Sequence, residues 1–193
     1  MKFMALDLEM NSPSNTIIQI GYTVFDPVIG YMYEDHSHYI YTQETIDPFI
    51  TKLTGITKDH MKNALSMEQA FEHLCTVHKK HECLPNFVVF GGNDHLLLKK
   101  QTAFLGQEWK FGSRCLDVKT VYQFWKLANN KDTIKGSLAR ALTYFGKNFI
   151  GTKHNAKDDA FNTARLFIEL IRYMKNCNDQ FTIDKVKKLL TED

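Results

Sequence analysis

The pattern of hydrophobic and polar residues begins with three stretches of strand character. Residues Phe3–Glu9 form an apolar run, and Thr16–Phe25 is rich in β-branched and aromatic residues. Asp26-Pro27 and Gly30 mark a turn, after which Tyr31–Tyr41 resumes strand character. Because tight connections join neighbouring antiparallel strands, this order predicts an antiparallel meander.

After residue 48 the pattern changes to helices interrupted by two short strands. The strands are expected at Phe87–Phe90 and near Arg114–Leu116. Helical segments are expected at Phe49–Leu53, Thr57–Met61, Met67–Lys80, His95–Leu105, Asp117–Ala128, Ser137–Phe145, Lys157–Cys177 and Thr182–Leu190. Strands first and strand–helix alternation afterwards predict an α/β fold with a mixed five-stranded sheet, an antiparallel meander plus parallel strands, flanked by helices.

Length and composition narrow the class of protein. The chain has 193 residues, of which 44% are hydrophobic and 24% charged, so it can bury a core as one domain over residues 1–193. Disorder and fibrous repeats are excluded. No apolar stretch approaches the ~20 residues of a membrane helix. The first ten residues do not form a signal peptide, so we expect a cytoplasmic protein without membrane contact.

The net charge of +2 hides an asymmetry between the halves of the chain. Residues 1–97 carry 6 Lys and Arg against 12 Asp and Glu, whereas residues 98–193 carry 18 against 10. The excess is concentrated in residues 98–157, with 12 basic against 3 acidic residues. A basic segment of this kind indicates a polyanionic partner such as nucleic acid.

The first candidate for chemistry is the sequence Asp7-Leu8-Glu9 within the first strand. Side chains alternate across a strand, so Asp7 and Glu9 share one face. Two carboxylates there lose solvation and repel each other, and a divalent cation would relieve both costs. The alternative is a strand end with both acids in water.

A second candidate follows the apolar strand Phe87–Phe90, in the sequence Gly91-Gly92-Asn93-Asp94. Sites in open sheets collect at the carboxyl ends of strands, where Asp94 stands. Asp94 could instead simply cap the helix that follows.

The third candidate is the sequence HNAKDDA at residues 154–160, at the start of the long helix. Ala156, Ala160 and Ala164 form a stripe of small residues that lets this helix approach the sheet closely. Asp159 would then lie near the strand that carries Asp7. Acids at a helix start also favour the helix dipole, a role that Asp158 alone could fill.

Together these motifs resemble the DEDDh (DnaQ-like) family of 3′→5′ exonucleases, which has an RNase H-like fold. The resemblance rests on DLE, on an Asp after an apolar strand, and on H-x-A-x-x-D-A, in that order. IIQIGYTVFD, LTGIT at 53–57, Gly136-Ser137-Leu138 and FIGTKHNAKDDAFNTARLF also resemble the family, and the likeness spans about residues 3–170.

The resemblance implies a role for each matching residue. Asp7, Glu9, Asp94 and Asp159 would hold two Mg²⁺ or Mn²⁺ ions, with Asp7 bridging them, and the motif spacing selects Asp159 over Asp158. His154 would be the general base. From their positions, Met10 and Asn11, just after the acidic strand, are candidates for contact with the substrate, together with Asn93 and His154. The implied activity is two-metal-ion hydrolysis at the 3′ end of single-stranded RNA or DNA to nucleoside 5′-monophosphates.

Several alternatives stay open at this point. The short GGND motif resembles the branch that trims small RNAs, with the KapD-like proteins, while oligoribonucleases and DNA-proofreading exonucleases share the same core. A catalytically silent nucleic-acid-binding module, or an enzyme of different chemistry on the same fold, would carry a similar sequence. The sequence Cys75-x2-His78-x2-His81-x-Cys83 has the composition of a zinc cluster without a standard spacing, and His36-x-His38 shares one strand face.

Overall fold

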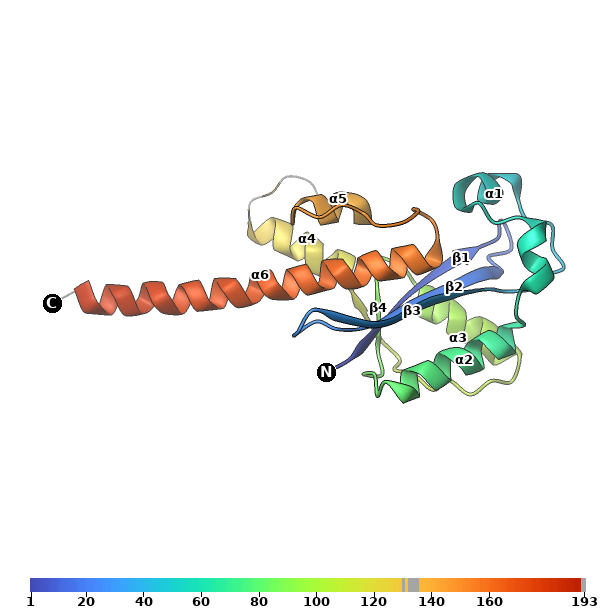
Figure 1. Cartoon of the computed structure of the whole chain (residues 1–193), viewed down its shortest axis with the longest axis horizontal. Coiled ribbons are helices and arrows are strands. Elements are labelled where there is room, and N and C mark those ends of the chain that lie inside the picture. Colours follow the sequence, from blue (N-terminus) through green and yellow to red (C-terminus); the bar gives the residue numbers. More distant parts are fainter. Residues whose placement is uncertain (130, 132–135, 192–193) are drawn as a thin grey trace.

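The computed structural model describes residues 1–129, 131 and 136–191, with side chains as far as Cys177. Its five-stranded sheet has the order β3-β2-β1-β4-β5 (Figure 1). The strands are β1 (Phe3–Met10), β2 (Ile17–Asp26), β3 (Tyr31–Tyr39), β4 (Phe87–Val89) and β5 (Cys115–Asp117). β1, β2 and β3 pair antiparallel, whereas β4 is parallel to both β1 and β5. The expected α/β fold with a mixed sheet is confirmed.

Helices cover both faces of this sheet (Figure 1). In chain order they are α1 (Pro48–Thr54), the 3₁₀ helix η1 (Lys58–Asn63), α2 (Met67–Lys80), α3 (Asp94–Phe104), α4 (Val118–Ala128), α5 (Leu138–Thr143) and α6 (Ala156–Thr191). The predicted bounds of α2 are confirmed, with Ser66 as its N-cap in a capping box with Gln69.

The alternation of side chains along β1 divides the core in two. Met4, Leu6 and Leu8 pack in one cluster with residues of α2 and α3. Phe3 and Ala5 point to the other face and pack with residues of α4, α5 and α6. Asp7 and Glu9 continue this second set, so they share the sheet face that α6 covers.

The end of the chain differs from the prediction of two helices. α6 continues through Thr182 to Thr191, so Thr182 is not the N-cap of a separate short helix. The physical reason is that no Gly or Pro occurs between Ala156 and Thr191 to end the helix. In the part of the chain that the structure describes, no helix has the length and apolar character needed to cross a membrane.

Candidate active site

The close approach of α6 to β2 brings the ends of the sequence together. Gly21 pairs with Asp7 in the sheet, and a Cβ on Gly21 would stand 2.1 Å from the backbone carbon of Ala156. The buried amide of Ala156 donates to Oε1 of Gln19 at 3.1 Å, so two residues of β2 hold the start of α6. Ala156, Ala160 and Ala164 are all fully buried, as the small-residue stripe predicted.

The loop before α6 orients its two aspartates differently. Asp159 accepts a hydrogen bond from the backbone N–H of His154 at 2.7 Å, and Asp158 accepts one from Thr152 at 2.7 Å. His154 has a left-handed backbone with φ of 61°. Gly151, with φ of 86°, leaves room for the Asp158 carboxylate, which a Cβ there would meet at 2.3 Å. Asp158 therefore holds the loop at Thr152, whereas Asp159, which accepts from the His154 amide, lines the cavity.

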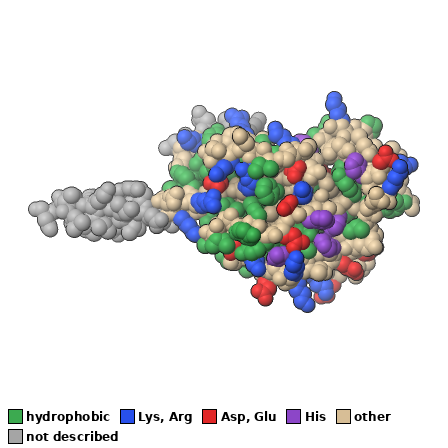
Figure 2. Space-filling model, viewed as in Figure 1, with side chains coloured by type: hydrophobic (Ala, Val, Ile, Leu, Met, Phe, Trp, Pro, Cys, Tyr) green, Lys and Arg blue, Asp and Glu red, His purple; other side chains and the backbone are tan. Residues whose placement is uncertain are grey.

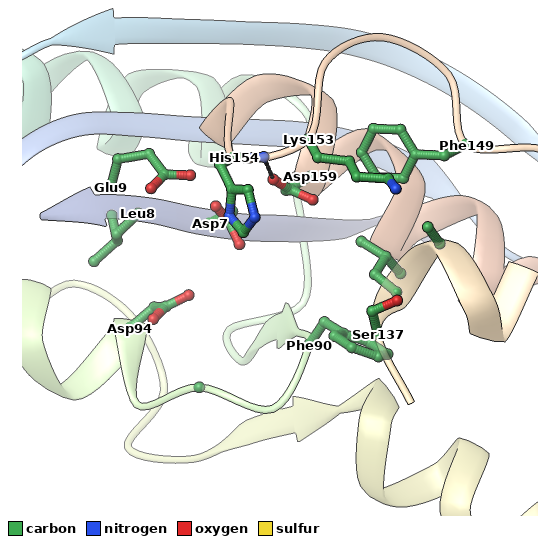
Figure 3. A pocket seen from close by; sticks show the side chains of 13 residues that line it. Asp7, Leu8, Glu9, Phe90, Asp94, Ser137, Phe149, Lys153, His154 and Asp159 are labelled. Carbon is green, nitrogen blue, oxygen red and sulfur yellow. Dashed lines mark hydrogen bonds between the residues drawn. The ribbon is translucent and has the colours of Figure 1, made fainter. Parts of the chain in front are cut away.

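Asp94 reaches the same region from the opposite side (Figure 3). It is the first residue of α3, and Asn93 occupies the N-cap position without a side-chain cap bond. The alternative that Asp94 merely caps the helix is therefore wrong. Its carboxylate lies opposite Asp7 and Glu9, across the space that these acids surround.

These side chains line one cavity of about 330 Å³. The five residues Asp7, Glu9, Asp94, His154 and Asp159 all contribute to its wall. Figure 3 shows His154 and Asp159 above Asp7, with Phe90, Ser137, Phe149 and Lys153 along one side. The structure thus brings together every acid and the histidine that the sequence singled out, from three separate parts of the chain.

Crowding of carboxylates perturbs their proton affinities. Burial, then the charges of Asp94, Asp159 and Glu9, raise the pKa of Asp7 well above its usual value. Burial and the neighbouring acids raise the pKa of Glu9 to about 7, and burial raises that of Asp94 to about 6. Burial also raises the pKa of Asp159, although the His154 amide opposes this. The site therefore favours added positive charge.

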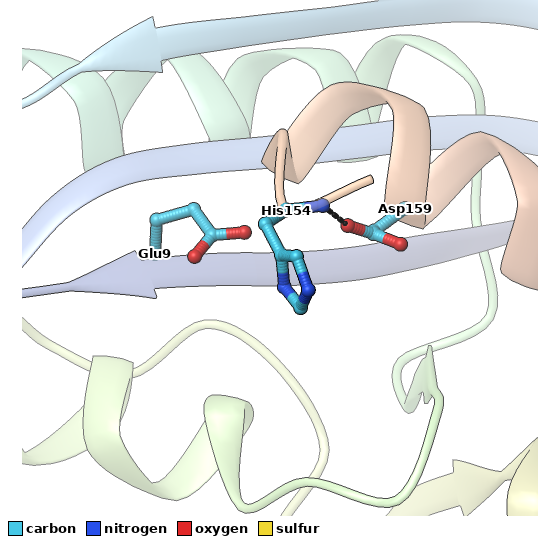
Figure 4. A group of neighbouring side chains, drawn as sticks. All are labelled: Glu9, His154 and Asp159. Atoms are coloured by element: carbon cyan, nitrogen blue, oxygen red, sulfur yellow. Dashed lines mark hydrogen bonds between the residues drawn. The ribbon is translucent and has the colours of Figure 1, made fainter. Parts of the chain in front are cut away.

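The donor atoms fit a divalent cation. One ligand atom from each of Glu9, His154 and Asp159 lies within 4.8 Å of the others. Figure 4 shows these three side chains as neighbours. Asp7 lies beside them, and its oxygens face the same space (Figure 3). Carboxylate oxygens are the ligands of hard cations such as Mg²⁺ and Mn²⁺, so the residues present suit such an ion.

The expected substrate contacts have different positions. Asn11 is 3% exposed, its amide donates to Glu44 and Thr45, and its carbonyl accepts from Asp47, so its polar atoms hold the loop around residue 45. Met10 packs against the core on the α2 side of the sheet, and Asn93 is exposed next to Asp94. None of the three is among the cavity-lining residues, because the cavity lies on the opposite face from Met10 and Asn11 is buried.

The cavity wall also contains residues for which the sequence motifs predict no contact with substrate. Phe90, Phe149 and Lys153 line the wall beside the acids. Lys153 belongs to the basic segment of residues 98–157, and its position directly before His154 is the sequence signal that points to the cavity. Within that segment Lys126 is 1% exposed and packs with Tyr122 and Tyr144, so it does not add to the surface charge.

The Cys and His residues around α2 do not converge on one point. His81 turns to Glu34, with Nε2 2.8 Å from the carboxylate, whereas His78 contacts the carbonyl of Leu84. Cys75 and Cys83 line a second cavity together with His78. The zinc-like composition of this segment therefore does not correspond to a four-ligand cluster.

Solved structures with the same fold include nucleases. The nuclease domain of 3′hExo, a DEDDh family member, bound to rAMP, superposes with a TM-score of 0.75 and 18% identity, covering 89% of this chain and 92% of that one. Cell-death related nuclease 4 (CRN-4) gives a TM-score of 0.77 and 16% identity, covering 89% of this chain and 64% of that one. The RNase H-like fold expected from the sequence is confirmed.

Sequence comparison gives the family. The chain is 29% identical over 103 residues to the DNA polymerase III PolC-type of Mycoplasmopsis pulmonis (strain UAB CTIP), which covers 52% of this chain but only 7% of the polymerase. The family model described as Exonuclease matches residues 4–167, which include the four acids and the histidine of the cavity. The expected exonuclease class is thus confirmed at the level of the family, and the chain belongs to the exonuclease (RNase_T) family.

Proposed function

We propose that this chain is a metal-dependent 3′→5′ exonuclease that hydrolyses the terminal phosphodiester of single-stranded RNA or DNA and releases nucleoside 5′-monophosphates. One observation carries the proposal: four carboxylates and one histidine, from β1, α3 and the start of α6, surround a single cavity. Burial, and then the mutual repulsion of the acids, raise the pKa values of Asp7 and Glu9, and a bound cation would relieve both effects.

Asp7, Glu9, Asp94 and Asp159 would hold two Mg²⁺ or Mn²⁺ ions, with Asp7 placed between the other three. When bound, such ions stabilise the attacking and leaving oxygens of a phosphodiester. The contribution of the protein is to fix the four carboxylates on rigid elements, a strand and two helix starts. The amide of His154 orients Asp159 through its 2.7 Å hydrogen bond.

His154 is the proposed general base. Its ring is exposed at the mouth of the cavity, and its left-handed backbone directs the side chain back over Asp7 (Figure 3). A ring nitrogen of an imidazole can accept the proton of the attacking water. The hydrogen bond from its own backbone to Asp159 couples the position of the base to that of the last carboxylate.

The cavity wall indicates how a nucleotide would be held. Phe90 and Phe149 offer aromatic rings for stacking against a terminal base, and Lys153 offers a charge for its phosphate. The bound rAMP of the 3′hExo nuclease domain supports a ribonucleotide, while the polymerase relative favours DNA. Specific membership of the small-RNA-trimming, KapD-like branch, single-domain organisation over residues 1–193 and a cytoplasmic location stay predictions from the sequence.

The decisive experiment follows a 5′-labelled single-stranded oligonucleotide, as RNA and as DNA, with the full chain. Stepwise shortening with Mg²⁺ or Mn²⁺, abolished by EDTA, is expected. Asp7→Asn should remove activity, and His154→Ala should slow it by about 10²–10⁴-fold. His60→Ala, outside the cavity, is the matched control and should behave as wild type. Internal fragments would indicate endonuclease chemistry, and binding without hydrolysis would indicate a silent module; either result overturns the proposal.

A further inference from the structure

Three histidines meet at the edge of the sheet, away from the carboxylate cavity. His36 and His38 lie on the edge strand β3, opposite Tyr22 and Ile20 of β2. Tyr22 and Ile20 are buried in the core cluster that includes α2, so the two histidines face the same side of the sheet as that helix. His73 of α2 completes the group. Figure 2 shows histidine side chains gathered on the face of the molecule in view.

The three imidazole rings are in direct contact. Nε2 of His38 lies 2.8 Å from Nδ1 of His73, and their ring centroids are 4.7 Å apart. The ring of His36 lies 4.5 Å from that of His38 and 5.9 Å from that of His73. His36 is exposed, whereas His38 and His73 are partly buried. Two nitrogens are therefore already adjacent, and the exposed third ring lies beside them.

Metal ions bind an imidazole through the lone pair of a ring nitrogen, in the neutral form of the ring. Burial, followed by the neighbouring histidines, lowers the pKa of His38 to about 4. Glu34, two positions before His36 on the same face of β3, is paired with Lys80 and His81 at 2.8 Å each, and Asp35, on the opposite face, lies 3.7 Å from Lys157. The bonded nitrogens of His38 and His73 have each other as partners, so a metal ion that bound both would replace this one hydrogen bond.

We propose that His36, His38 and His73 form a second metal site, for an imidazole-preferring transition-metal ion such as Zn²⁺. Three histidines and one water complete a tetrahedral site with metal–nitrogen distances of about 2.0–2.1 Å, so ligand nitrogens stand about 3.3 Å apart. His38 and His73 would separate by about 0.5 Å to admit the ion, and His36 would turn inward about its side-chain bonds.

This site is chemically and spatially distinct from the carboxylate cavity. Its ligands are nitrogens on the α2 side of the sheet, whereas Asp7 and Glu9 face α6 on the other side. Oxygen ligands favour Mg²⁺ and Mn²⁺, and imidazoles favour Zn²⁺, Ni²⁺ and Cu²⁺. A bound ion would join the edge strand β3 to α2, and thereby fasten a strand whose outer edge has no partner strand in the described sheet.

The test uses the full chain without a histidine tag, freed of metal and then supplied with excess Mg²⁺ to occupy the carboxylates. Calorimetric titration with Zn²⁺ should show one site. His36→Ala should weaken it by about tenfold or more, since loss of even an outer-shell partner costs that much. His36 is exposed, so the variant should melt like wild type in EDTA. His73→Gln provides a second, independent removal of a ligand.

Matched controls separate this site from the rest of the chain. His60→Ala removes a histidine whose Nδ1 is bonded at Thr57, and Asp7→Asn removes an acid of the cavity. Both should keep Zn²⁺ binding, and Cu²⁺ bound at the site should show nitrogen couplings in its electron paramagnetic resonance spectrum. Equal Zn²⁺ affinity of wild type and His36→Ala, or loss of binding in Asp7→Asn, would overturn the proposal without affecting the exonuclease assignment.

Discussion

Gly21 of β2 lies directly against the backbone of Ala156, the first residue of α6. A Cβ on Gly21 would stand 2.1 Å from the carbon, 2.2 Å from the oxygen and 2.3 Å from the next amide nitrogen at that point. All three are backbone atoms, which cannot move without displacing the helix. Because Gly21 pairs with Asp7 and Ala156 precedes Asp159 by one turn, this contact sets the distance between the two carboxylates.

Gly21→Ala should therefore damage both stability and activity. Overpacking of this kind costs about 1–3 kcal/mol, measured as the free energy of unfolding in urea. The helix start should shift, so exonuclease activity per folded molecule should also fall. Gly136→Ala is the control, since a Cβ there meets Tyr122 only at 3.6 Å, an ordinary contact. A Gly21→Ala protein with wild-type stability would show that α6 does not rest on β2 as described.

The parts of the site that depend on the local periodicity of a strand or helix could be predicted from the sequence. Asp7 and Glu9 share a face because strand side chains alternate, and the alanines of α6 signalled a close helix. The contribution of Gly21 was not predictable, because it depends on which strand the helix crosses. The bond from the Ala156 amide to Gln19 spans 137 positions in the chain, and the loop contacts of Asn11 span more than 30. Such pairings arise only from tertiary packing.

The two neighbouring aspartates of α6 should respond differently to substitution. Asp159→Asn removes a charge from the cavity, and activity should fall about a hundredfold or more, together with Mn²⁺ affinity. Asp158→Asn keeps an oxygen that can still accept from Thr152, so its activity should stay within a few-fold of wild type. Steady-state rates and Mn²⁺ titrations on both variants check this. The reverse order of effects would assign Asp158 to the cavity instead.

In the metal-free protein, the carboxylates of the cavity should lower the free energy of unfolding, and this loss should grow as the pH rises. Glu9 has a pKa of about 7 and Asp94 of about 6, above the ~4 of unfolded chains. Between those values the folded protein retains protons that the unfolded chain has released, so these groups lower stability as pH rises from about 4 to 7. Above pH 7 the penalty is complete, and bound Mg²⁺ or Mn²⁺ should remove it.

The contribution of Glu9 to this pH dependence can be measured by comparing Glu9→Gln with wild type. His38, whose pKa is lowered to about 4, has the opposite slope below pH 6.5, because there the unfolded chain takes up the extra proton. Because both proteins contain His38, its contribution cancels in the difference between their free energies of unfolding, measured in urea with EDTA present. Glu9→Gln should be the more stable by about 0.5–2 kcal/mol at pH 8, with a smaller margin at pH 5. A margin independent of pH would contradict the raised pKa of Glu9.

Lys153 is the basic residue of the cavity wall, and its substitution should change binding more than chemistry. Its amine lies beside Phe149 on the wall of the cavity (Figure 3), where it could contact a phosphate of the strand that enters. Lys153→Gln should raise KM with kcat largely retained, and should reduce the slope of log affinity against log salt by about 0.7, one single-strand phosphate contact. Lys79→Gln, on α2 across the sheet, should leave both quantities unchanged. A fall in kcat at constant KM would instead place Lys153 in transition-state stabilisation, and an unchanged salt slope would exclude a phosphate contact.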